Sequence, residues 1–291
     1  MSVSNPTVSV LMTAYNREKY IADAICSVLA SSFTDFELIV VDDGSSDRTV
    51  AIAREFEATD RRVRVEVNPV NLGDYPNRNR AAALANGRYL KYVDSDDIIY
   101  PHGLAMMVEC MEKVPEAGLG LQRPPQPDVP YPIALTPHEA YREHFLGSGS
   151  LFAEAPISLI FRAAEFREVG GFSGRRFVGD TEFCLKMGAR YPTVKMPFGL
   201  VWWRSHGEQE IVLGQVAAGY PVMTYQITVD ALASPENPLE PAERVTALRR
   251  VRKSHTRLIW RTALHRLRIG DARTIMKETR FRIRDVLQSS F

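Results

Sequence analysis

Cysteine is scarce in this chain and shows no paired spacing. The three cysteines, Cys26, Cys110 and Cys184, lie far apart, and no two of them form a Cys-x-x-Cys pair. An odd number without that spacing argues against a disulfide framework and against a cysteine-bound zinc. We expect all three to be reduced and buried within helices.

Long apolar runs are missing as well. No run approaches the roughly 18–20 residues that a membrane-spanning helix needs, and the N-terminus lacks the basic segment and apolar core of a signal peptide. These absences predict a soluble, cytoplasmic protein. No Gly-x-Gly-x-x-Gly follows the first apolar segment, which argues against a dinucleotide-dependent oxidoreductase.

The chain does contain enough apolar sequence for a full core. Of its 291 residues, 45% are hydrophobic, so one large α/β domain with an appendage is expected. The apolar pattern predicts strands at residues 8–16, 36–41 and 63–67 and helices at 17–30 and 49–57. This alternation is typical of a parallel βαβ sheet. The polar loops at 13–16, 42–47 and 94–97 follow strands, so we expect them along one edge of that sheet.

The densest group of acids closes the last of these strands. In the segment Lys91-Tyr92-Val93-Asp94-Ser95-Asp96-Asp97, three carboxylates follow apolar and aromatic residues. Mg²⁺ and Mn²⁺ are commonly bound by one or two carboxylates together with phosphate oxygens, so the segment is a candidate metal site. Taken alone, it is equally typical of a solvated loop or a helix N-cap.

Five motifs together resemble family 2 glycosyltransferases with the GT-A fold. They are Met12-Thr13-Ala14-Tyr15-Asn16-Arg17, then Phe36 to Asp47, then Asn71-Leu72-Gly73 with Arg78-Asn79, then Asp94 to Asp97, and finally Gly170-Gly171-Phe172 with Gly179-Asp180. The resemblance covers roughly the first 210 residues. It implies an α/β fold with a Rossmann-like, mostly parallel sheet flanked by helices. It also implies a nucleotide-binding half at 1–100 and an acceptor-binding half at 101–210, followed by a basic helical region at 211–291.

The same resemblance implies a nucleotide-diphosphate-sugar donor, expected to be a UDP-sugar. Tyr15 would stack on the base, and Thr13 and Asp43 would hydrogen-bond it. Arg78 would reach the base or the diphosphate, although the nearby Arg80 can exchange with it in this role. Alternatively, Tyr15 packs on the sheet, and Asp43 shapes an Asx turn that Asp42 or Ser45 can equally form.

Asp94 and Asp96 are expected to hold the cofactor, Mn²⁺ or Mg²⁺. The resemblance implies that Asp96 binds the metal directly and that Asp94 meets the ribose or a metal-bound water, with Asp97 as a third candidate. A cation bridging the two phosphates would stabilise the leaving nucleoside diphosphate. His206 resembles the C-terminal histidine that approaches the metal in GT-A enzymes, although a lone histidine is more often structural.

Inverting sugar transfer needs a base that takes a proton from the acceptor hydroxyl. Asp180 is our candidate, because it stands where the family has an acidic pair at the beginning of a helix. Gly179 occupies the position of the first acid, and Glu182 is a second candidate for the base. The alternative for Asp180 is an ordinary N-cap.

These residues predict a metal-dependent, inverting glycosyltransferase that acts on a glycan or lipid-linked hydroxyl acceptor. The missing first acid keeps an alternative open, namely a nucleotide-sugar-binding protein without transfer activity. The acceptor is expected near Gly147-Ser148-Gly149-Ser150 and Trp202-Trp203, although both tryptophans can equally be packing residues. Residues 121–137 contain six prolines and are predicted to lack regular structure.

The last 51 residues are strongly basic. From Pro241 to Phe291 there are 14 Lys and Arg against 4 acids, although the whole chain has a net charge of only +1. The spacing of their apolar residues predicts helices. Such helices can contact an anionic membrane at its inner face, dock on the acidic remainder of the chain, or form a homo-oligomer. Nucleic acid is not an expected partner, because aromatic residues for base stacking are nearly absent there.

Overall fold

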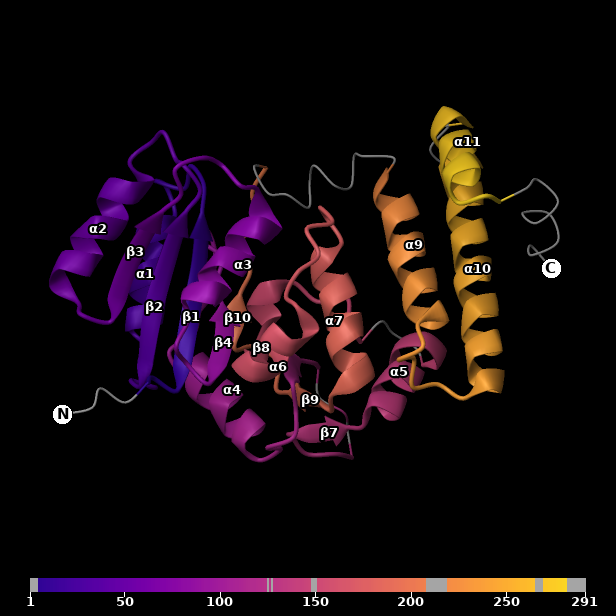
Figure 1. Cartoon of the computed structure of the whole chain (residues 1–291), viewed down its shortest axis with the longest axis horizontal. Helices are drawn as coiled ribbons and strands as arrows, with labels where there is room; N and C mark the ends of the chain where they lie inside the picture. Colours follow the sequence, from indigo (N-terminus) through magenta and orange to yellow (C-terminus); the bar gives the residue numbers. More distant parts are fainter. Residues whose placement is uncertain are drawn as a thin grey trace. The chain divides into compact units, whose positions relative to one another are not determined.

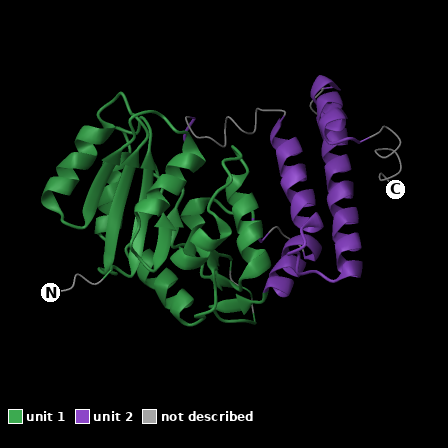
Figure 2. Cartoon of the chain, viewed as in Figure 1, with its two compact units in different colours: residues 1–136, 153–205 green, residues 137–152, 206–291 purple. Residues whose placement is uncertain are grey.

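The chain forms two compact units, coloured separately in Figure 2. The computed structural model describes residues 5–124, 126, 128–147, 151–207, 219–264 and 269–281. The first unit comprises residues 1–136 and 153–205, and the second comprises residues 137–152 and 206–291.

An eight-stranded sheet forms the centre of the first unit, in the order β3-β2-β1-β4-β8-β6-β9-β7 (Figure 1). Strands β3, β2, β1 and β4 are mutually parallel, and β8 runs antiparallel to β4. The strands are β1 Val8–Ala14, β2 Phe36–Asp42, β3 Val63–Val67, β4 Tyr89–Tyr92, β6 Leu119–Gln122, β7 Ile133–Leu135, β8 Leu159–Arg162 and β9 Thr193–Met196. A second sheet pairs β5 Ile98–Ile99 with β10 Val201–Trp202. The predicted α/β class is confirmed.

Helices cover both faces of the large sheet. They are α1 Ile21–Leu29, α2 Thr49–Thr59, α3 Asp74–Leu84, α4 Gly103–Glu112, α6 Ala163–Val169 and α7 Gly179–Arg190, with a short 3₁₀ turn η1 Pro156–Ser158. Helices α1, α2 and α4 pack on alternate residues of the strands, including Val10 and Met12. On the opposite face, Tyr92 of β4 packs against Phe166 of α6. Burial on both faces explains why the parallel strands read as continuous apolar runs.

The predicted early elements are confirmed, but two other expectations were wrong. Cys26 is exposed, because it lies on the outer face of α1, whereas Cys110 and Cys184 are buried as expected. The proline-rich stretch also contributes to the sheet, since β7 pairs antiparallel with β9 at the sheet edge. Residues 133–135 carry no proline, so their N–H groups remain available for an edge ladder.

The second unit consists of helices α5 Pro137–Leu146, α9 Gly219–Ala233, α10 Pro241–Leu264 and α11 Ile269–Glu278. The helical prediction for the basic region is confirmed over α10 and α11. Val222, Ile259, Ala272 and Ile275 form a shared core of α9, α10 and α11, so the apolar side of α10 is covered at Ile259 by helices of its own unit, whereas Val245 and Leu264 are exposed. Arg266, Leu267 and Arg268 lie outside the described residues. Over the described part of the chain, no helix is both long and apolar enough to traverse a bilayer.

Candidate functional site

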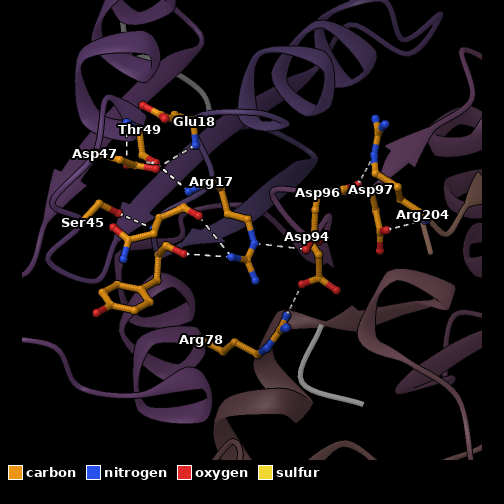
Figure 3. Close-up of polar contacts among 12 residues, drawn as sticks. Arg17, Glu18, Ser45, Asp47, Thr49, Arg78, Asp94, Asp96, Asp97 and Arg204 are labelled. Carbon is orange, nitrogen blue, oxygen red and sulfur yellow. Dashed lines mark hydrogen bonds and ion pairs between the residues drawn. The ribbon is translucent and has the colours of Figure 1, made fainter. Parts of the chain in front are cut away.

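The loops after β1 and β2 are bound to each other by side-chain hydrogen bonds. Asn16, which has a φ of 53°, donates its N–H to Ser45 Oγ at 2.8 Å, and Arg17 donates its N–H to Thr49 Oγ1 at 2.7 Å. Figure 3 shows both contacts. They fix the backbone directly after Tyr15, which is 49% exposed. Tyr15 therefore does not pack against the sheet as the alternative proposed, and its ring is accessible for stacking.

Asp42 forms the Asx turn that follows β2. One of its carboxylate oxygens accepts the N–H groups of Gly44 and Ser45, at 3.0 and 2.8 Å. This turn chemistry is what the Asp-Gly sequence favours. Because Asp42 forms the Asx turn, Asp43 is available for a different role.

Asp43 instead holds the beginning of α3. It is 3% exposed and accepts hydrogen bonds from Asn68 Nδ2 and from the N–H groups of Leu72 and Gly73, at 2.7, 2.8 and 2.8 Å. A carboxylate offers about four acceptor positions, and these three bonds use three of them; the hydrogen bond to a base stays a prediction. The Asn-Leu-Gly motif thus serves the geometry of this turn.

The three acids after β4 have different partners, drawn in Figure 3. Asp94 pairs with the Arg78 guanidinium at 2.7 Å, and Asp96 pairs with Arg17 Nε at 3.1 Å. Arg78 in turn pairs with Asp74, at 2.8 Å. Two arginines, Arg17 from the loop after β1 and Arg78 from α3, thus compensate the charges of the two predicted metal ligands.

Asp97, the third acid after β4, is buried and hydrogen-bonded to the backbone of another segment. It is 1% exposed and accepts the N–H of Arg204 at 2.8 Å. Burial, reinforced by the negative charge of Asp94, raises the pKa of Asp97 to about 8. These contacts give Asp97 a structural role, fixing the chain that leaves β10.

Two further cations at this cluster escaped the sequence analysis. Lys91 is fully buried in β4 and donates to the carbonyl oxygen of Ile157, and burial lowers its pKa to about 7. Arg204 donates from Nε to the Asp96 carbonyl at 2.8 Å, and its guanidinium lies 5.0 Å from the Trp202 ring centroid. The charge of Lys91 was visible as an unexpected lysine in an apolar strand. Nothing local in the sequence marked the Arg204 contact.

The acid pair has the donor set that Mg²⁺ or Mn²⁺ prefers, but it is not a complete metal site by itself. Among the described residues, no group of three His, Cys, Asp or Glu side chains is arranged to hold a metal ion. Hard cations of this kind usually retain waters and take phosphate oxygens from the substrate, so two carboxylates fit. His206 begins the second segment of the second unit, and its role as a ligand stays a prediction.

Asp180 occupies the first turn of α7. Val178, and not Asp180, is the N-cap residue of this helix, so the N-cap alternative was wrong. Asp180 Oδ1 accepts the N–H of Thr181 at 2.7 Å. Burial raises the pKa of Asp180 to about 6, which suits a base working near neutral pH. Glu182, the other candidate, forms a hydrogen bond with the Ser173 hydroxyl and lies 3.4 Å from Lys186 Nζ.

The expected acceptor residues are described only in part. Ser148, Gly149 and Ser150 lie outside the described residues. Trp202 and Trp203 are 45% and 49% exposed, so neither is a core residue.

Comparison with known proteins decides the family. Residues 9–170 match the model of "Glycosyl transferase family 2", which is more than half of the chain. The chain belongs to glycosyl transferase family 2. Within the family it resembles the putative teichuronic acid biosynthesis glycosyltransferase TuaG of Bacillus subtilis, with 42% identity over 32% of this chain and 36% of that protein. It also resembles the UDP-Glc:alpha-D-GlcNAc-diphosphoundecaprenol beta-1,3-glucosyltransferase WfgD of Escherichia coli, with 39% identity over 36% of this chain and 41% of that protein. The matched stretch thus spans about two-fifths of these relatives at most.

Solved structures support the fold over nearly the whole chain. S. aureus TarS 1–349 superposes with a TM-score of 0.69 at 20% identity, covering 97% of this chain and 80% of that one. The mannosyltransferase PcManGT from Pyrobaculum calidifontis, in complex with GDP-Man and Mn²⁺, gives a TM-score of 0.59 at 16% identity, covering 99% and 87%. The GT-A fold predicted from the motifs is therefore confirmed.

Proposed function

We propose that this family 2 protein transfers a sugar, with inversion, from a nucleotide-diphosphate donor to a hydroxyl acceptor. The observation that carries the proposal is the meeting of Asp94 and Asp96 with Arg17 and Arg78 at the carboxyl edge of the parallel strands. That edge is where open α/β sheets bind their ligands. A UDP-sugar is the donor we infer, in keeping with the UDP-GlcNAc complex of TarS 1–349.

The donor would be bound mainly by the first hundred residues. Tyr15 would stack on the base, Thr13 and Asp43 would hydrogen-bond it, and Arg78 would approach the diphosphate. Mn²⁺ or Mg²⁺, held by Asp96 and Asp94 with help from His206, would offset the charge of the departing diphosphate. The guanidinium groups of Arg17 and Arg78 add fixed positive charge at the same edge, where it counts most as the glycosidic bond breaks.

Asp180 would act as the general base on the acceptor side, within residues 101–210. Its Oδ1 is held by the Thr181 N–H, so Oδ2 would take the proton from the acceptor hydroxyl as that oxygen attacks the anomeric carbon. The exposed Trp202 and Trp203 offer ring faces for the acceptor.

We infer a glycan or lipid-linked acceptor, and a membrane contact made by the basic C-terminal helices from the cytoplasmic side. The support is twofold. The relative WfgD is named for a diphosphoundecaprenol-linked acceptor. In addition, α10 exposes the arginines Arg249, Arg250, Arg252, Arg257 and Arg261, which an anionic surface attracts.

A two-part experiment tests the proposal. UDP-, GDP- and dTDP-sugars are first screened for Mn²⁺-dependent thermal stabilisation, because a ligand that binds only the folded state raises the melting temperature. The stabilising donor is then incubated with glycan and polyprenyl-diphosphate-linked acceptors, and the anomeric configuration of the product is determined by NMR. Donor binding without transfer to any acceptor would favour the alternative of a nucleotide-sugar-binding protein. A retained configuration would contradict inversion.

A further inference from the structure

A tyrosine fills the space that the first acid of the family pair would need. A Cβ added to Gly179 would lie 2.8 Å from both Cε2 and Cζ of Tyr75, well inside the distance of about 3.5 Å at which carbon atoms pack. Any side chain at this position, an acid included, would therefore meet the Tyr75 ring. The glycine is a packing requirement of its neighbour.

The Tyr75 ring is also packed against Phe172. Tyr75 is 5% exposed, and its ring centroid lies 5.2 Å from that of Phe172. The backbone of Phe172 is fixed by Asn79, which accepts its N–H at 2.9 Å and donates to its carbonyl at 2.8 Å. Because the ring is buried and packed against Phe172, a larger residue at 179 could be accommodated only by disturbing this packing.

The Tyr75 hydroxyl reaches the backbone of the proposed base. It accepts the Asp180 N–H at 3.2 Å. The first N–H groups of a helix have no partner within that helix, and the N-cap residue Val178 supplies no side-chain hydrogen bond. Burial raises the pKa of Tyr75, so the hydroxyl stays neutral near physiological pH. One residue of α3 therefore caps α7 at the residue that carries the base.

We propose that Tyr75 is a positioning residue for Asp180, and that the Tyr75–Gly179 pair replaces the first acid of the family motif. Tyr75 holds the backbone from which the Asp180 carboxylate projects, while the Thr181 N–H holds one of its oxygens. This inference rests on the proposed role of Asp180 as the base. It also removes the reason to regard Gly179 as a sign of lost activity, because the glycine accommodates a substitute for the missing side chain.

Tyr75→Phe, which deletes only the hydroxyl, is the direct test, with Tyr89→Phe as the matched control. Tyr89 is also buried in the first unit. It begins β4, at the end of the strand away from Asp94, and its hydroxyl forms a hydrogen bond with Glu112 at 2.9 Å. Removing the partner of this part-buried N–H weakens the placement of Asp180, so we expect kcat to fall at least about tenfold. Donor Kd, measured by calorimetry, should stay within about twofold. A wild-type kcat in Tyr75→Phe, or an equal loss in Tyr89→Phe, would overturn the proposal.

A double-mutant cycle sharpens the test. Gly179→Ala should displace the Tyr75 ring, and it should lower kcat because the hydrogen bond between the Tyr75 hydroxyl and the Asp180 N–H is lost. If so, Tyr75→Phe/Gly179→Ala should lose no more kcat than the worse single variant. Losses that multiply would show two separate effects and would reject the pair.

Asp180→Asn separates the two levels of inference. Turnover at the wild-type rate in Asp180→Asn would show that the proposed base is wrong, and the positioning role would fall with it. A large loss in Asp180→Asn together with an unchanged kcat in Tyr75→Phe would leave the proposed base standing and defeat only the role of Tyr75.

Discussion

The carboxylates in the turn after β4 and the carboxylate in the first turn of α7 have opposite electrostatic environments. Asp94 and Asp96 each face an arginine, at 2.7 and 3.1 Å. Asp180 has no such ion pair among the described residues, and burial raises its pKa to about 6. Acids paired with arginines lie at a site with charges of both signs, whereas a buried acid with a raised pKa can exchange its proton near neutral pH. The difference fits the proposed roles, electrostatic stabilisation in the first region and proton transfer in the second.

Removing an acid from the first region should have the largest effect. We expect Asp96→Ala to abolish detectable transfer and to sharply weaken Mn²⁺-dependent donor binding, because the diphosphate would lose its bridging cation. Calorimetric titration of donor with and without Mn²⁺ measures this. Glu116→Ala, an exposed acid beyond α4, is the control. Unchanged metal-dependent binding in Asp96→Ala would reject its assignment as a ligand.

Removing the acid of the second region should leave donor binding intact. Asp180→Asn is expected to lower kcat by about 10²–10⁴-fold, the usual contribution of a general base, while donor Kd changes little. The proton moves only in the transition state, so the loss should appear in kcat. Glu182→Gln should keep most of its turnover. The reverse pattern would make Glu182 the base.

The pH dependence of kcat/KM tests the raised pKa of Asp180 independently, with a smaller expected effect. A base must be deprotonated to act, and the pKa of Asp180 is raised from its ordinary value of 3.8 to about 6. The value of kcat/KM should therefore be level above that pH and fall about tenfold for each pH unit below it. The residual activity of Asp180→Asn should lack this acidic limb. A limb that persists in the variant would belong to another group.

Arg17 allows a finer test of the first region. Its guanidinium lies against Asp96, where it competes with a metal ion for the same carboxylate. Arg17→Gln should bind Mn²⁺ several-fold more tightly in the absence of donor, yet bind the donor diphosphate more weakly. The partly exposed ion pair contributes only about 0.2–1 kcal/mol to stability, so the melting temperature should hardly change. Weaker Mn²⁺ binding without donor would mean that Arg17 orients Asp96 rather than competes for it.

How far the sequence predicted this site depends on the separation of the residues involved. The strands, the polar loops and the acids Asp94 and Asp96 were visible, because apolar runs and turn residues are local signals. The same signals did not show which of Asp42 and Asp43 forms the Asx turn, because either acid can do so.

Contacts between distant segments carried no such signal. Arg17 meets Asp96 across 79 residues, and Tyr75 meets Asp180 across 105. The sequence marked Gly179 as a departure from the family pattern but could not identify Tyr75 as its cause. In the same way, α5 packs with α10 in the second unit although the sequence placed it with the acceptor-binding half.

The exposed arginines of α10 differ from Arg17 and Arg78, which are paired with acids of the site. Replacing them should have the smallest effect on catalysis. Arg257 and Arg261 lie one helical turn apart, and both are exposed. Near an anionic bilayer each is worth about 1 kcal/mol. We therefore expect Arg257→Glu/Arg261→Glu to bind anionic liposomes at least about tenfold more weakly in sedimentation, with kcat on a soluble acceptor unchanged.

The matched control makes the same charge change in the first unit, at the exposed Arg54 and Arg61. Arg54→Glu/Arg61→Glu should sediment like the wild type, and added salt should weaken wild-type binding, because charges are screened over about 10 Å at 0.1 M. If the full-length protein ignores anionic liposomes, the basic face serves another contact. A change in oligomeric mass on charge reversal, measured by light scattering, would then identify that contact as one between copies of the chain.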